Sequence, residues 1–166
     1  MAIFGAFVSS SSATWMRRQR RLDEGRAKLR TAGWAVPVRV RSTFPMDIRG
    51  EVIVETSFDE ATAIEAVAAC AIDAGYQRAA AIGITAAFRR GSEWKALSSF
   101  DLVDVPSEIA LWVEAPSTAG LTRLRCVMTY RTNAHYVSEE DIEQSTIEFS
   151  SVVRALQPRS IARPSP

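Results

Sequence analysis

The sequence predicts an α+β fold: an antiparallel sheet of about five strands with two amphipathic helices on one face, plus a basic N-terminal helix. Segments 47–56 and 121–132 alternate apolar and polar residues, which is the period of a half-buried strand. Segments 57–75 and 139–156 instead repeat apolar residues at the spacing of a helix that covers a sheet. The 166 residues are 47% hydrophobic and 23% charged, as in globular domains with a full-sized core.

Charge divides the chain into unequal parts. Residues 1–50 carry ten Arg or Lys and three Asp or Glu, whereas residues 51–166 carry ten and sixteen. We predict a basic N-terminal arm at 1–33, an α+β body at 34–157 and a disordered tail at 158–166. A basic arm on an acidic body predicts either internal docking or an anionic partner for the arm.

The arm contains a predicted helix at 14–32, which Gly33 ends. Its apolar residues Trp15, Leu22 and Leu29 are spaced by seven. They form a seam narrower than the stripe of a core helix, which is roughly 100° wide. This helix is therefore predicted to lie on the surface or to be held by a partner.

Two strands follow the arm. The segment 36–41 is predicted to be an edge strand, because Pro37 has no backbone N–H to donate to a neighbour on that side. The segment 47–56 is predicted to be a longer strand that leads directly into the first body helix.

The first body helix is predicted at 57–75. Ser57 and Glu60 match a capping box, and Gly75 provides a residue that tolerates the left-handed conformation at a helix end. Its sheet-facing side is predicted to comprise Ala61, Ile64, Val67, Ala68, Ala71 and Ile72.

Residues 77–89 alternate without a break and are predicted to form a single strand. One face of this strand is made of small residues, among them Ala79, Ala81 and Gly83. Small residues on a sheet either let a helix pack closely or leave room for a ligand between the sheet and the helix at 57–75.

The next strands are predicted at 97–105, 107–115 and 121–132. The last two form a hairpin whose register follows from polarity, since a slip of one residue would set Val113 against Arg123. The predicted pairs are Glu114–Arg123, Trp112–Arg125, Ala110–Val127, Val113–Leu124, Leu111–Cys126 and Ile109–Met128.

The last helix is predicted at 139–156. Ser138 is its expected N-cap, with Asp141 at the capping-box position. Ile147 is the one apolar residue that falls on the polar side of this helix, and Pro158 stands just beyond its end.

A long C-terminal helix after a β-hairpin resembles the helix-grip fold of START-like lipid-binding domains. The long helix at 57–75 departs from the short helices usual there, and no motif adds to the resemblance, so no family is assigned. What the resemblance implies is an alternative function as a small-hydrophobic-ligand binding domain, with Ala79, Ala81 and Gly83 lining the cavity.

Catalytic and metal chemistry find little support in the sequence. The single histidine, His135, stands close to Glu139 and Glu140, and an enzyme using His135 is a further alternative. Cys70 and Cys126 form no closely spaced motif, and no glycine-rich nucleotide loop or GxSxG motif occurs. We predict no catalytic site, no metal site and no cofactor.

The basic arm is the best functional candidate. We predict a non-enzymatic interaction or assembly protein whose arm docks on an acidic protein surface or on a membrane. A protein partner or homo-oligomer is favoured, an anionic membrane surface is the alternative, and nucleic acid has the least support. We expect a cytoplasmic protein, with peripheral membrane attachment as the variant. The predicted partner-binding residues are Trp15, Arg17, Arg18, Arg20, Arg21, Arg26 and Arg30.

Overall fold

The computed structural model describes residues 13, 15–27, 39–43, 47–80, 82–98, 101–114, 120–132 and 137–157. Residues 15–27 are helical and are called the basic helix below. The other elements within these ranges are β1 (Arg39–Thr43), β2 (Asp47–Thr56), α2 (Glu60–Asp73), β3 (Gln77–Ala79), β4 (Ala86–Arg90), α3 (Glu93–Ser98), β5 (Ser107–Val113), β6 (Thr122–Arg131) and α4 (Glu139–Ala155).

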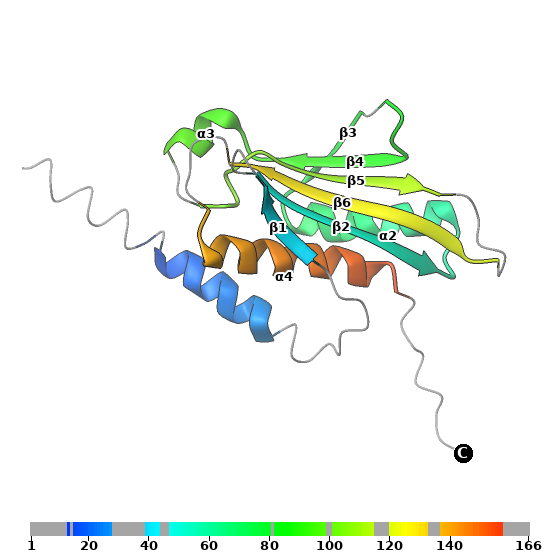
Figure 1. Cartoon of the computed structure of the whole chain (residues 1–166), viewed down its shortest axis with the longest axis horizontal. Coiled ribbons are helices and arrows are strands. Elements are labelled where there is room, and N and C mark those ends of the chain that lie inside the picture. Colours follow the sequence, from blue (N-terminus) through cyan, green and yellow to red (C-terminus); the bar gives the residue numbers. More distant parts are fainter. Residues whose placement is uncertain are drawn as a thin grey trace, which may run out of the picture.

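The strands form one antiparallel sheet in the order β1-β2-β6-β5-β4-β3. Helices α2 and α4 lie side by side on one face of this sheet (Figure 1). The predicted α+β class is therefore confirmed, and so is the edge position of the first strand. The predicted strand began at residue 36, and residues 36–38 lie outside the described part of the chain.

The hairpin of β5 and β6 has the predicted register. Trp112 lies opposite Arg125 and Val113 lies opposite Leu124. The exposed face gains the expected contacts, because the Arg125 guanidinium carbon lies 5.5 Å from the centre of the Trp112 ring. Arg123 pairs with Glu114 at 3.1 Å. Agreement in polarity across the two strands was thus sufficient to fix their alignment.

Two strand predictions are wrong. The segment 77–89 is not one strand but a hairpin of β3 and β4, and Gly83 adopts a φ of 71° between the two strands. The described residues of the segment 97–105 do not form a strand, since α3 extends to Ser98 and residues 102–104 form a turn before β5.

Helix α2 starts later and faces the sheet differently than predicted. Asp59, not Ser57, is the N-cap, and its carboxylate accepts the Thr62 N–H at 2.8 Å. The buried residues are Ala63, Val67, Ala68 and Ala71, while Ile72 is 58% exposed. The small alanines allow α2 to pack closely on its neighbours, which outweighs the larger transfer free energy of the isoleucine.

Helix α4 begins as predicted, with Ser138 as the N-cap and Asp141 completing a capping box. Its Phe149 ring lies so close to β2 that a Cβ atom on Gly50 would approach it to 2.5 Å. A bare glycine in the centre of β2 therefore lets the aromatic ring lie directly on the backbone of the sheet.

Candidate functional site

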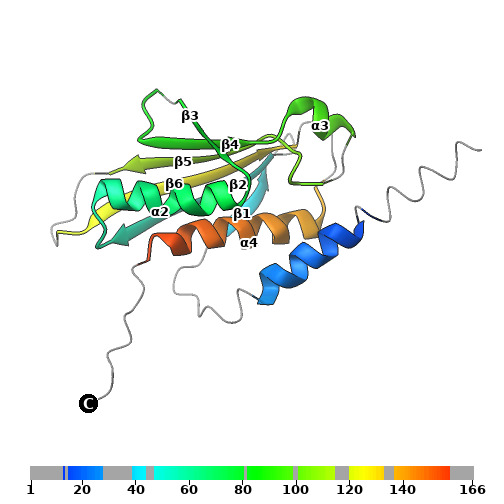
Figure 2. The same cartoon turned by 180° about the vertical axis from the view of Figure 1, so that it is seen from behind.

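The basic helix lies on the side of α4 that faces away from the sheet (Figures 1 and 2). The molecule thus has a third layer beyond the sheet and the two body helices. Leu22 is 1% exposed, yet it does not belong to the main core cluster between sheet and helices. Of the three seam residues predicted for this helix, Trp15 is 60% exposed, Leu22 is buried, and Leu29 lies outside the described residues.

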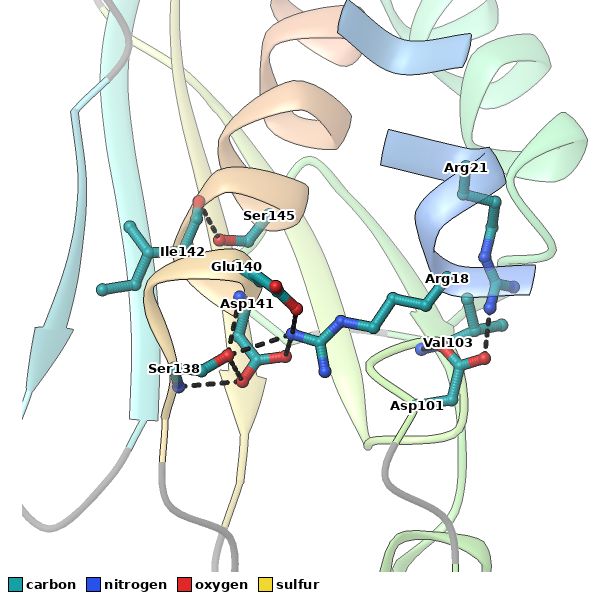
Figure 3. Close-up of polar contacts among 9 residues, drawn as sticks. All are labelled: Arg18, Arg21, Asp101, Val103, Ser138, Glu140, Asp141, Ile142 and Ser145. Atoms are coloured by element: carbon teal, nitrogen blue, oxygen red, sulfur yellow. Dashed lines mark hydrogen bonds and ion pairs between the residues drawn. The ribbon is translucent and has the colours of Figure 1, made fainter. Parts of the chain in front are cut away.

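Arg18 ties the basic helix to the first turn of α4 (Figure 3). Its Nη2 atom donates to the Ser138 hydroxyl at 3.0 Å and to the Asp141 carboxylate at 2.8 Å, and it lies 3.3 Å from Glu140. The same Ser138 and Asp141 side chains cap α4, so the arm is fastened to the capping box itself.

Arg21 and Arg26 also form ion pairs with the body. Arg21 pairs with Asp101, whose other carboxylate oxygen accepts the Val103 N–H (Figure 3). Arg26 forms a bidentate pair with Glu143, with Nε–Oε1 and Nη2–Oε2 both 2.6 Å.

The pKa values of the Arg26–Glu143 pair respond to this contact. The hydrogen bond from Arg26, followed by its charge, lowers the pKa of Glu143, and the same contact raises the pKa of Arg26. Both groups are therefore held in their charged forms.

The basic helix and α4 approach each other closely at Gly25. A Cβ atom on Gly25 would lie 2.6 Å from the Ile147 Cγ2 atom, so the absence of a side chain at Gly25 sets the approach of the two helices. Ile147, which stood alone on the polar side of α4 in the sequence, is thus covered by the arm.

Three other predicted partner-binding residues, Trp15, Arg17 and Arg20, lie on the outer side of the basic helix. Trp15 is 60% exposed, and the Arg17 Nε atom donates to the Ala13 carbonyl at 3.2 Å. Arg20 pairs with Glu24 at 2.8 Å and leaves 82% of its side chain in solvent. The structure therefore divides the predicted arginines into an inward set and an outward set.

The other predicted residues are not brought together. Ala79 lines a surface groove of about 320 Å³ beside β3, whereas Gly83 stands in the exposed turn, where a Cβ atom would meet no other atom within 4 Å. Arg30, Ala81 and His135 lie outside the described residues. The ligand-cavity and His135 alternatives stay predictions.

A buried polar cluster at one end of the helix-covered face of the sheet was not predicted. The Arg90 Nη2 atom lies 3.0 Å and 3.1 Å from the two carboxylate oxygens of Glu148, and the Tyr76 hydroxyl donates to Glu148 at 2.7 Å. Arg90 Nη1 donates to the Ala74 carbonyl at 2.6 Å, and its guanidinium lies 4.4 Å from the centre of the Tyr76 ring. The cluster joins β4, the end of α2 and the middle of α4.

Burial and charge act in opposite directions within this cluster. Burial is the largest single effect on Arg90 and favours its neutral form. The charge and hydrogen bond of Glu148, together with Tyr76 and Tyr130, outweigh burial, so that the pKa of Arg90 is raised. Burial, reinforced by the Glu148 charge, raises the pKa of Tyr76. The ion pair and a neutral tyrosine are therefore the stable states.

Comparisons with known proteins leave the chain unassigned, because no protein-family model, curated protein or solved structure matches it. Across the ranges that the structure describes, no helix combines the length and apolar character needed to cross a bilayer. In the same ranges, no three His, Cys, Asp or Glu side chains gather where they could share a metal ion.

Proposed function

We propose that this chain is a non-enzymatic interaction protein whose basic helix docks on an acidic protein surface. The observation that carries the proposal is the inward set of arginines: Arg18, Arg21 and Arg26 each meet a carboxylate of the body. Guanidinium forks suit carboxylates on a helix surface because they donate two parallel hydrogen bonds. In the described state, the body itself serves as the acidic surface.

The charge of the outward face favours a protein over a membrane as the partner. Within the described residues 15–27, Arg17 and Arg20 share the exposed side of the helix with Asp23 and Glu24, so that this stretch has no excess of positive charge on that side. An anionic membrane surface attracts roughly in proportion to the number of free cations. The positive charge that could bind a partner is the inward set, which requires the helix to leave the body.

The test is binding of a labelled acidic peptide with the sequence of residues 137–151, measured by fluorescence anisotropy. We expect the full chain to bind it more tightly at low than at high salt. A chain with R21E and R26E should lose this binding, whereas the matched outward variant with R17E and R20E should keep it. A peptide with glutamine at 140 and 143, which keeps three of the five carboxylates, is the control of reduced charge. Binding to anionic vesicles without binding to the acidic peptide would contradict the proposal.

A further inference from the structure

The surface at the end of β4 has a groove of about 250 Å³, which is called the arginine groove here. Its volume lies just below the roughly 300–1,000 Å³ of drug-sized ligand sites, so that it suits a small ligand. The groove is formed where β4 ends, β5 begins and β6 ends. Its charged and hydroxyl-bearing lining residues are Arg89, Arg90, Ser107, Glu108, Thr129 and Arg131.

Backbone contacts fix the walls of this groove. The Arg131 N–H donates to the Pro106 carbonyl at 2.8 Å, which joins the end of β6 to the start of β5. Gly91, at the end of β4, has a φ of 80°, and a Cβ atom there would collide with the Val105 carbonyl. Glycine therefore lets the two segments approach each other. A groove whose backbone is fixed in this way needs little ordering when a ligand binds.

The charges of the groove are not fully balanced. Arg89 pairs with Glu108 at 2.5 Å, and Arg90 pairs with Glu148 at 3.0 Å. Arg131 differs from them, because it is exposed and forms no ion pair within the part of the chain that the structure describes. The described lining therefore keeps one positive charge that no carboxylate neutralises.

Two buried hydrogen-bond donors at the groove are also unused. Ser107 is 5% exposed, and the Arg90 side chain is 7% exposed. Ser107 lies near enough to Tyr76 to oppose the rise of its pKa, yet among the described residues neither its hydroxyl nor the Arg90 Nε–H makes a hydrogen bond of ordinary geometry. Arg90 and Ser107 lie opposite each other across β4 and β5, so that their side chains are neighbours on the sheet. Buried polar groups are nearly always paired, so two unused donors side by side point to a ligand that accepts from them.

We infer that the arginine groove binds a small tetrahedral oxyanion, either free phosphate or the phosphate group of a small phosphomonoester. Arg131 and Thr129 make the first contacts, because both are open to solvent. The Arg90 Nε atom and the Ser107 hydroxyl are closed to water in the described structure, so a small side-chain shift brings them to the anion. Donors at both the rim and the floor of a groove match the oxygens of a tetrahedral anion better than the two oxygens of a planar carboxylate. Guanidinium groups are well suited to phosphate.

The experiment titrates inorganic phosphate into the full chain at constant ionic strength and follows the backbone amide signals by NMR. We expect saturable shifts at Gly91, Ser107 and Arg131. The R131Q variant should bind phosphate about tenfold or more weakly, because it loses a hydrogen bond between charged groups. The matched control is R123Q, which removes an arginine from the same face of β6 at the other end of the strand. It should bind phosphate like the native chain.

The S107A variant separates a binding role from a structural one. Because the Ser107 hydroxyl has no hydrogen-bond partner among the described residues, its removal should leave Tm unchanged and weaken the binding of phosphate. A fall in Tm with unchanged affinity for phosphate would contradict the inference.

Two further probes define the anion. Glycerol phosphate that binds at least as tightly as inorganic phosphate would indicate a phosphomonoester site, whereas binding of inorganic phosphate alone would indicate a site for the free ion, and both results support the inference. Acetate that binds as tightly as phosphate would overturn it. So would the absence of saturable shifts, or an equal loss of affinity in R131Q and R123Q. The proposed docking of the basic helix uses none of these residues, so the two proposals stand or fall separately.

Discussion

Replacing Glu148 with leucine should be among the most destabilising substitutions in the body. It removes the carboxylate that accepts hydrogen bonds from Arg90 and Tyr76. The guanidinium would keep only the Ala74 carbonyl and the face of the Tyr76 ring. Arg90 exposes 7% of its side chain, so its charge would be left buried without a counter-charge.

The magnitude follows from two losses. Leaving one partner of a buried ion pair alone costs about 3–5 kcal/mol. An unpaired buried hydroxyl on Tyr76 adds about 1–2 kcal/mol. The sum is a large part of the roughly 5–15 kcal/mol that stabilises a typical domain. For a chain of this size it corresponds to a fall in Tm of roughly 10–25 °C.

The assay is urea unfolding followed by circular dichroism, arranged as a double-mutant cycle. E148L and R90M are measured alone and together. We expect the double variant to be far more stable than the sum of the single effects predicts, because it removes both charges and leaves apolar side chains of similar size. E148Q serves as the control that keeps the shape of the side chain and loses its charge.

A competing possibility can be separated by the same data. Arg90 also lines two surface grooves, of about 320 Å³ and 250 Å³, on either side of the end of β4. If water entering from these grooves solvated the guanidinium, E148L would cost less than about 1 kcal/mol, as at an exposed ion pair. A small single effect, or single effects that simply add, would refute our reasoning.

Three further predictions concern other parts of the molecule. Gly50→Ala should destabilise the chain by about 1–3 kcal/mol in urea unfolding, because the added methyl group meets the Phe149 ring. The pKa of Glu143 is lowered when the arm is docked, so its contribution to docking is complete above the ordinary glutamate pKa of about 4.3 and is lost as pH falls through the docked value. Limited proteolysis of the arm should therefore accelerate over that acidic range. The E143Q variant should remove this pH dependence. Burial raises the pKa of Cys126 to about 12, so iodoacetamide at pH 8 should leave this thiol unmodified in the folded chain and modify it only in denaturant. Mass spectrometry measures the modification, and the partly exposed Cys70 is the internal comparison.

Strong local patterns were sufficient to predict several elements. Segment 47–56 alternates clearly and forms β2 over the same residues. The β5–β6 register followed because a slip of one residue would have set Val113 against Arg123 instead of Leu124. The capping box of α4 was visible because Ser138 and Asp141 stand at the required spacing.

Alanine-rich segments gave no such guidance. Between Gln77 and Arg89 the alternation continues through the turn, so no change of pattern marks where β3 ends and β4 begins. In α2 the predicted sheet-facing side included Ile72 and left out Ala63, but the structure buries Ala63 and leaves Ile72 58% exposed. Close packing of helices selects residues by size as well as by hydrophobicity, and periodicity reports hydrophobicity alone.

The polar cluster escaped prediction because its members are far apart in the chain. Arg90 follows Ala86 and Phe88 on the covered face of β4, which is an unusual place for a charge. Glu148 directly precedes the buried Phe149 on α4. Each charge on an otherwise apolar face signals a buried partner, since neither can be buried alone. The sequence contains both signals but does not show that they belong to one pair.

The docking of the arm also depends on residues that need a partner, and here the sequence indicated both sides of the contact. Leu22 and Ile147 are each too isolated to build a core face, yet both are apolar residues on otherwise polar surfaces. Arginines surround the first and carboxylates surround the second. Both apolar residues can be covered at once when the two helices pack together, because the arginines around Leu22 then pair with the carboxylates around Ile147. Gly25 allows the close approach of the helices. Burial of the Leu22 side chain stabilises this contact at any salt concentration, and the partly exposed ion pairs of Arg21 and Arg26 add an electrostatic contribution that salt weakens.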